Sequence, residues 1–355
     1  MRTMNIVTQR LVRFVVCLSW AASLGGIVLA LVAPDVARLA IVQWSPWLLG
    51  LFALGIPHGA LDHRVGGDLA PTANDRPARS SGPLFYVAYL AAAGLVVLVW
   101  WVSPMVASVG FLAVAAVHFG QGDVYWSRRF GLAARTDSVG YRMALLVARS
   151  ALPIAWPILA FPGELAGAAS VLASRLYGRA SWSIPPQAIT VGLILVVTAV
   201  GLQVSWAAWL GFRGDRLTRW LACGDIAETM LLVALFGLVP PVLALGLYFN
   251  AWHSLRHVIR LLLLDGSTQK LVESGRWIDA FVAFQKQSLP MTCGACALLI
   301  GLGLVMGRSV VSIVDLGLVA LVTLSALTLP HFLVVIWMDR RQGIWSPSPD
   351  QSQGS

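Results

Sequence analysis

Long apolar runs constrain the fold of this chain more than any other feature. Windows of roughly 20 apolar residues, the length that a helix needs to cross a bilayer, recur throughout it. We predict about ten spans (eight to ten): 12–33, 39–61, 83–102, 104–122, 142–161, 188–211, 220–239, 241–263, 289–307 and 311–338. Because backbone groups in lipid must satisfy one another, such runs predict an all-α, polytopic transmembrane helical bundle.

The composition supports this prediction. Of the 355 residues, 58% are hydrophobic and only 12% are charged, and the mean hydropathy is +0.77. A soluble domain would carry about a quarter charged residues. Since these charges are too few to cover a surface in water, we expect a multi-pass protein of the cell (inner) membrane, in contact with lipid.

The positive charges predict the orientation. If the N-terminus is inside, 19 Lys and Arg residues lie in inner segments and 4 lie in outer loops. This asymmetry follows the positive-inside rule, so we predict that both the N- and C-termini are cytoplasmic. The net charge of +9 does not indicate nucleic-acid binding, because no basic run with interleaved aromatic residues appears.

No soluble domain fits between the predicted spans. The longest connections are 62–82, 162–187 and 264–288. The last contains "GRWIDAFVAFQK", which predicts an amphipathic helix lying on the inner leaflet. We therefore expect one integral membrane domain over residues 1–342 and a disordered C-terminal tail over 343–355, where "SPSPDQSQGS" has a disordered composition.

Five of the six histidines lie inside predicted spans, all toward the inner end of even-numbered ones: His58, His118, His253, His257 and His331. A lone intramembrane histidine is commonly a packed residue that hydrogen-bonds a neighbouring helix. Five at one depth are harder to explain by packing, since ionisable groups are expensive in lipid. Neutral imidazoles bind first-row metals without adding charge, so the pattern favours a metal or haem site.

The spacing narrows the chemistry of that site. His253 and His257 are four residues apart and share a helical face. A zinc protease would need Glu after the first histidine, where this chain has Ser254. A haem between two facing histidine pairs remains an alternative, but an all-imidazole site with open positions suits iron(II) that binds dioxygen. Two other classes thus stay open: a haem-binding electron carrier and a non-catalytic transporter of a lipid or carotenoid.

Four acidic residues could support such ligands. Asp225 and Glu228 lie in the inner half of the seventh predicted span, where a carboxylate could accept the distal N–H of a ligating histidine. Pairing between helices, for example with Arg256, is an equal alternative. Asp62 and Asp123 follow the first two intramembrane histidines by four and five residues, and could be either second-shell groups or solvated end-caps.

Four sequence blocks carry a resemblance to a known family: "GIPHGALDH" (55–63), "HFGQGD" (118–123), "NAWHSLRH" (250–257) and "LPHFLVVIWMD" (329–339). In this order they resemble the bacteriorhodopsin-related protein family (Brp/Blh), which comprises membrane-bound beta-carotene 15,15'-dioxygenases. The resemblance implies that the domain over residues 1–342 is catalytic.

The resemblance also implies the ligands. Carried over to this chain, the family's pattern is an Fe(2+) ion held by His58, His118, His253 and His257, with no catalytic residue beyond them. His331 has no certain ligand role and is assigned to the second shell or the substrate channel. Trp252 is the best candidate for lining that channel.

The implied reaction adds dioxygen across the central double bond of beta-carotene and yields two molecules of all-trans-retinal. Both oxygen atoms end in product, so no reductase is needed. The carotenoid can enter laterally from lipid, and an apolar channel would hold its central bond beside the metal. The product implies a functional link to a retinal-binding rhodopsin.

Overall fold

The computed structural model describes residues 5–68, 82–177, 185–306 and 313–346, and all regular elements in these ranges are helical. The predicted all-α class is therefore confirmed. Eight of the helices found in these ranges are long and apolar enough to cross a membrane: Ile6–Val32, Ala40–Val65, Pro83–Val102, Pro104–Phe130, Val139–Ala160, Pro186–Arg213, Arg216–Leu238 and Gly317–Arg341. The chain is a multi-pass membrane protein.

These eight match the first seven predicted spans and the tenth. The predicted spans 241–263 and 289–307 are not among them. The first of the two is helical, as α13 (Pro241–Leu247), η2 (Tyr248–Ser254) and α14 (Leu255–Leu262), but its histidines and arginines lower its hydropathy. The second lies in α16 (Trp277–Met306) up to Met306, and its last residue lies outside the described residues.

Two histidine-bearing segments contain π-helical turns. In the first, η1 (Leu51–Gly55) lies between α3 (Ala40–Gly50) and α4 (Ile56–Ala60). In the second, η2 itself carries His253. A π turn accommodates one residue more than an α turn and is frequent at functional sites. The backbone is therefore irregular at both of these histidine blocks, as is common at functional sites.

The predicted connections contain more helix than the sequence indicated. Residues 62–82 begin with α5 (Asp62–Asp68), and residues 162–187 contain α10 (Pro162–Tyr177), which packs beside α9 (Val139–Ala160). Within 264–288, Asp265 caps α15 (Gly266–Glu273) by accepting a hydrogen bond from the Thr268 backbone N–H.

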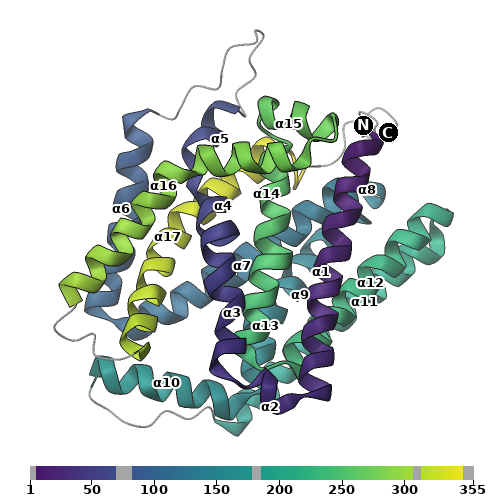
Figure 1. Cartoon of the computed structure of the whole chain (residues 1–355). Helices are drawn as coiled ribbons and strands as arrows, with labels where there is room; N and C mark the ends of the chain where they lie inside the picture. The colour runs from purple at the N-terminus through teal and green to yellow at the C-terminus, as the bar shows by residue number, and fades with distance from the viewer. Residues whose placement is uncertain (1–4, 69–81, 178–184, 307–312, 347–355) are drawn as a thin grey trace. The chain divides into compact units, whose positions relative to one another are not determined.

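The predicted amphipathic helix is not a separate element. From Trp277 onward its residues form the first part of α16, which runs without a break into the predicted ninth span. Pro290 lies inside this helix, and Figure 1 shows that the helix changes direction along its length. A proline removes one backbone hydrogen bond and bends a helix without having to end it. Of the predicted tail, residues 347–355 lie outside the described residues.

The chain divides into two compact units, each built from three separate stretches. Unit 1 comprises Met1–Val15, Leu49–Val114 and Ser254–Met338, and unit 2 comprises Val16–Leu48, Ala115–His253 and Asp339–Ser355. Several long helices run from one stretch into the next, so the two units are interleaved along the chain. Each unit is described by itself below.

Unit 1 contains α4, α5 and α14–α16 together with α6 (Pro83–Val102) and α17 (Ile313–Arg341). Helix α4 packs against α14 and α16. Trp100 of α6 donates an indole hydrogen bond of 2.6 Å to the Ser325 hydroxyl of α17. A polar contact of this kind joins helices in lipid, where no hydrophobic effect operates between them.

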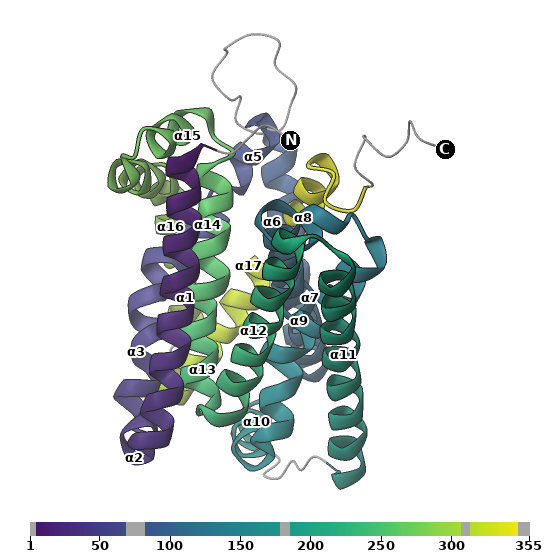
Figure 2. The same ribbon diagram turned by 90° about the vertical axis from the view of Figure 1, so that its right-hand side faces the viewer.

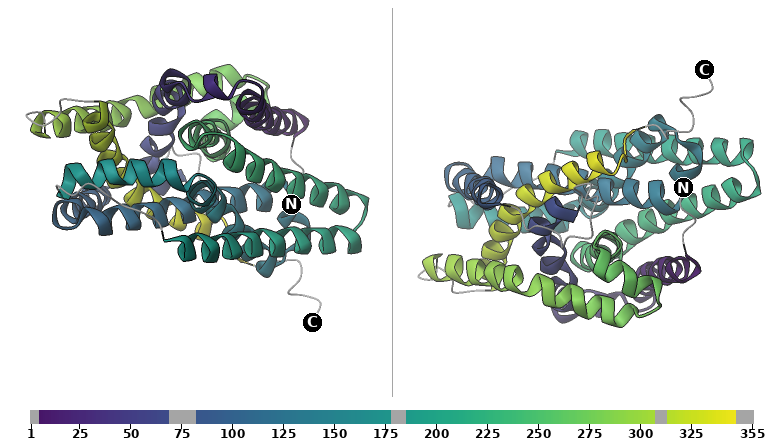
Figure 3. Two further views of the ribbon diagram at one scale, coloured as in Figure 1. Left: turned by 90° about the horizontal axis from the view of Figure 1, so that it is seen from below. Right: turned by 90° about the horizontal axis from the view of Figure 1, so that it is seen from above.

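In unit 2, α9, α11 (Pro186–Arg213) and α12 (Arg216–Leu238) pack side by side. Figures 2 and 3 show α11 and α12 as a hairpin with α9 beside it. Tyr141, Leu145, Ala207 and Ala222 are buried in their shared core. Small residues at such contacts let helix backbones approach closely.

Gly120 of α7 (Pro104–Phe130) gives a test of close packing in unit 2. A Cβ atom there would lie 2.7 Å from the Leu146 carbonyl oxygen of α9 and would also meet the Ser150 hydroxyl. We expect Gly120→Ala to destabilise the metal-free protein by about 1–3 kcal/mol, the usual cost of overpacking. Thermal unfolding in detergent measures this.

The matched control is Gly110→Ala on the same helix, where a Cβ atom would meet nothing within 4 Å. This substitution should leave the unfolding temperature unchanged or slightly raised, because Ala has the higher helix propensity. Equal effects of the two substitutions would contradict the packing described for α7 and α9.

Candidate metal centre

Three buried histidines of unit 1 come together from three helices: His58 of α4, His257 of α14 and His331 of α17. Their ring centroids are 5.4 Å apart for His58 and His257, 5.0 Å for His58 and His331, and 5.3 Å for His257 and His331. Each pair meets edge to face, with interplanar angles of 71°, 83° and 74°. The three rings thus surround one point at similar distances.

Hydrogen bonds fix the tautomers of two of these rings. His58 Nδ1 lies 3.1 Å from the Leu54 carbonyl oxygen, and His331 Nδ1 lies 3.0 Å from both carboxylate oxygens of Asp62. Carbonyl and carboxylate oxygens accept hydrogen bonds, so Nδ1 carries the proton in each ring. The lone pair of each neutral imidazole is then on Nε2, which is the atom able to ligate a metal.

Unit 2 holds a second pair of buried histidines, His118 of α7 and His253 of η2. Their Nε2 atoms are 3.1 Å apart, and their ring centroids are 4.7 Å apart. Phe119 meets the His253 ring edge to face at 4.8 Å, and Phe249 stacks on it at 6.1 Å. The pair is therefore held in an aromatic environment.

The spacings within both groups fit imidazole ligation. A ligating nitrogen lies about 2.1 Å from a first-row metal, so two nitrogens at angles between 90° and tetrahedral are about 3.0–3.4 Å apart. The corresponding ring centres are then roughly 4.6–5.3 Å apart. The Nε2 separation in unit 2 and the centroid separations in both units lie in or close to these ranges. A neutral all-imidazole donor set suits iron(II), copper or zinc.

Trp252 and Asp123 connect the two histidine-bearing elements of unit 2. Trp252 is 1% exposed, and its indole N–H donates a 3.0 Å hydrogen bond to Asp123 Oδ1. Trp252 precedes His253, and Asp123 lies in the same helix as His118. This bond thus limits how far η2 can move relative to α7. Asp123 is buried and is not a solvated end-cap.

Arg149 of α9 is buried among three carboxylates of unit 2. Its guanidinium lies 3.6 Å from Asp123, 3.9 Å from Asp225 and 3.8 Å from Glu228. Tyr141 and Gln203 donate to Asp225, and Trp20 donates to Glu228. The predicted pairing of Asp225 and Glu228 with an arginine between helices is therefore seen, with Arg149 as a partner.

The sequence missed several residues around these sites. Arg149 is a cation in the middle of an apolar helix, which was a signal in itself because charges at that depth need partners. Tyr89 and Tyr141 gave no such signal. Their roles depend on Asp62 and Asp225, which are distant in the chain. The sixth histidine, His63, is half-buried, lies against Tyr86, and donates to the Ala60 carbonyl oxygen.

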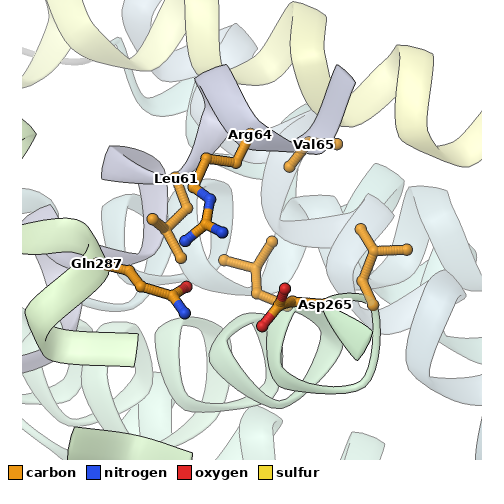
Figure 4. Close-up of a pocket in the computed structure, with 7 residues that line it drawn as sticks. Leu61, Arg64, Val65, Asp265 and Gln287 are labelled. Atoms are coloured by element: carbon orange, nitrogen blue, oxygen red, sulfur yellow. The ribbon is translucent and has the colours of Figure 1, made fainter. Parts of the chain in front are cut away.

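A small hollow in unit 1 lies near the end of α5. Figure 4 shows Arg64 pointing into it, with Asp265 and Gln287 around it. Its volume of about 10 Å³ admits roughly one water molecule and no carotenoid. Burial opposes ionisation of Asp265, but hydrogen bonds from Ser267 and Thr268 and the charge of Arg64 outweigh it and hold the pKa of its carboxyl below the usual value.

Fold and site together define a class: a multi-pass helical membrane protein with buried histidine clusters suited to a metal. The pattern of the BCD family, described as beta-carotene 15,15'-dioxygenase, matches residues 49–339. The chain belongs to this family, as its four histidine blocks indicated.

Relatives from Halobacterium salinarum agree with this assignment. The protein named "Probable beta-carotene 15,15'-dioxygenase Blh" is 30% identical over 340 residues, which cover 91% of this chain and 93% of that protein. "Probable beta-carotene 15,15'-dioxygenase Brp" is 29% identical over 325 residues, or 86% of each chain. No solved structure matches.

The Arg149 cluster gives a prediction about stability. Arg149→Met would leave the buried Asp123 and the partly buried Asp225 and Glu228 without that guanidinium, and removing one partner of a buried ion pair costs about 3–5 kcal/mol. We expect a large fall in the thermal unfolding temperature in detergent. Arg38→Met is the control, because Arg38 pairs with Glu164 at an exposed position, where a pair is worth about 0–1 kcal/mol. Similar shifts for both variants would count against the role given to Arg149.

Proposed function

We propose that this protein cleaves the central 15,15' double bond of beta-carotene with dioxygen and releases two molecules of all-trans-retinal. His58, His118, His253 and His257 hold the Fe(2+) ion that the reaction needs. Two oxygen atoms enter and two aldehydes leave, so the reaction balances without a reductant. Family membership supports the choice of substrate.

The observation that carries the proposal is the pair of imidazole clusters. Each proposed ligand is buried, and within its own unit each lies near another histidine at a spacing suited to a shared ion. Two neutral imidazoles could also share a hydrogen bond at such distances. The family match favours a shared metal over a hydrogen bond between the rings. The membrane depth predicted from the sequence, which is the same for the four histidines, favours it too.

The bound iron would supply redox chemistry with dioxygen, and the protein's own residues control what reaches it. The hydrogen bond that His58 Nδ1 donates to the Leu54 carbonyl oxygen keeps Nε2 as the ligating atom of His58. The aromatic rings near His253 keep water away from its imidazole. The substrate is a hydrocarbon that dissolves in lipid, so it can enter from the bilayer. Asp62 orients His331, and the bond between Trp252 and Asp123 holds η2 beside α7. Asp225 and Glu228 act through Arg149, which also faces Asp123.

We further propose ten spans, with residues 1–342 as one catalytic domain and both termini in the cytoplasm of a cell whose inner membrane holds the protein. The 19-to-4 distribution of Lys and Arg supports this topology. Retinal is an aldehyde of low water solubility, so a retinal-binding rhodopsin in the same membrane is a natural acceptor.

Expression in cells that accumulate beta-carotene tests the reaction. We expect the orange colour to fade and two retinal molecules to appear per carotene lost, as measured by chromatography. His257→Ala should lower retinal formation at least about 100-fold, because even second-shell changes weaken metal binding by 10–100-fold. His63→Ala, which changes the histidine beside Tyr86, should leave it intact.

Metal removal tests the iron. Chelation of purified protein should abolish retinal formation, and Fe(2+) but not Zn(2+) should restore it, because zinc has no redox chemistry. A strong Soret band would instead identify a haem carrier. Activity that survives complete metal removal would refute the proposed site.

Reporter fusions test the topology. Green fluorescent protein fused after Gly214 or Ser274 should fluoresce, because both positions are predicted to be cytoplasmic, whereas alkaline phosphatase should be active after Val239. The fusion after Ser274 tests whether segment 241–263 crosses the membrane. An active phosphatase at Ser274 would mean that this segment does not cross and that the ten-span topology is wrong.

A further inference from the structure

His331 is the one intramembrane histidine to which the proposed function gives no ligand role. It lies in α17, in the block "LPHFLVV", and is 5% exposed. Its ring nevertheless contacts both His58 and His257 edge to face, at centroid distances of 5.0 and 5.3 Å. These distances match the 5.4 Å between His58 and His257 themselves.

The arrangement of the three rings is nearly threefold. All three planes are steeply inclined to one another, and the three separations differ by only a few tenths of an ångström. Three imidazoles that bind one face of an ion adopt such an arrangement, whereas histidines packed only for burial have no reason to be equally spaced. The ligand nitrogens of His58 and His331 lie within 4.8 Å of each other, so these two rings can offer nitrogens to one ion.

The Asp62 carboxylate fixes the orientation of His331. It accepts from Nδ1 at 3.0 Å through either oxygen, and the Tyr89 hydroxyl donates to the same carboxylate at 3.3 Å. A metal-ligating histidine almost always donates its other N–H to a carboxylate, carbonyl or water, which raises the basicity of the ligating nitrogen. The Asp62–His331 pair has this geometry.

Gly59 allows His331 to approach α4 closely. A Cβ atom at Gly59 would lie 3.4 Å from His331 Nδ1 and 3.6 Å from its Cγ, which is already van der Waals contact. Any longer side chain would displace the ring from its place beside His58. The "PHG" triplet therefore supplies one imidazole, and its glycine makes room for a second.

We infer that His331 is a further iron ligand, which offers its Nε2 atom to the ion together with His58 and is positioned by Asp62 and Tyr89. This inference rests on the iron of the proposed function. His331 would then hold the ion in addition to the four histidines proposed above.

Iron affinity of the purified full-length protein, measured by competition with a chromogenic chelator, tests the inference. We expect His331→Ala to weaken iron binding at least about 100-fold. Asp62→Asn keeps an acceptor but loses the charge, so it should weaken binding about 10-fold, within the range for second-shell changes. His63→Ala, one residue from Asp62 in the chain, is the matched control and should bind iron as the wild type does.

Each variant is first checked for a single size-exclusion peak and for its unfolding temperature without metal. If His331→Ala does not fold, His331→Gln fills the space and is judged by the same criterion. Added imidazole should restore iron binding to folded His331→Ala, which leaves a cavity for it, and not to folded Asp62→Asn. A folded His331 variant that holds iron as tightly as the wild type would overturn the inference.

Retinal formation by the wild type, measured in parallel, separates this inference from the proposed function. Iron binding that depends on His331, without retinal formation, would refute the reaction and leave the ligand assignment standing. Retinal formation with iron that is held equally well without His331 would refute the ligand assignment and leave the reaction standing.

Discussion

The loss of water around ionisable groups is the constraint on which this structure depends. Inside a bilayer a charge or a polar atom is stable only where the protein replaces its solvation. The chain meets this constraint in two ways. Its buried imidazoles can stay neutral and donate to fixed acceptors such as Leu54 and Asp62. Its buried guanidinium at Arg149 is surrounded by carboxylates.

These two solutions have different consequences for a metal. Neutral imidazoles bring no charge to balance a divalent cation, so a ligand set made only of histidines leaves its charge exposed to the low-dielectric interior. A carboxylate hydrogen-bonded to a ligating ring supplies part of the missing negative charge without occupying a coordination position. Asp62 is placed to do this through His331. The Arg149 cluster instead holds its helices in place and keeps a cation and its partners together within unit 2.

The sequence predicted those features that depend only on the order of residues along the chain. Lipid imposes a length on each apolar run, so eight spans followed from hydropathy, and the histidine blocks followed from polar residues inside those runs. Partners across the fold were not predictable in this way. Asp62 was expected to share a helical face with His58 or to cap a helix end, yet it bonds His331, 269 positions away. Helix α10 and the continuous α16 were missed because Pro162 and Pro290 resemble helix ends in the sequence.

The π turns at η1 and η2 determine the direction in which the side chains after them point. Each holds one residue more than an α turn, which shifts the phase of the helix beyond it by about 100° while adding only about 1.5 Å of length. An uninterrupted α-helix over Tyr248–Ser254 would therefore turn His257 toward a different neighbour and hardly change the length of the span. The membrane thickness sets the length of this helix, and the ligand position sets the direction of its histidines. The π turn lets the helix meet both requirements, because it changes side-chain direction with little change in length.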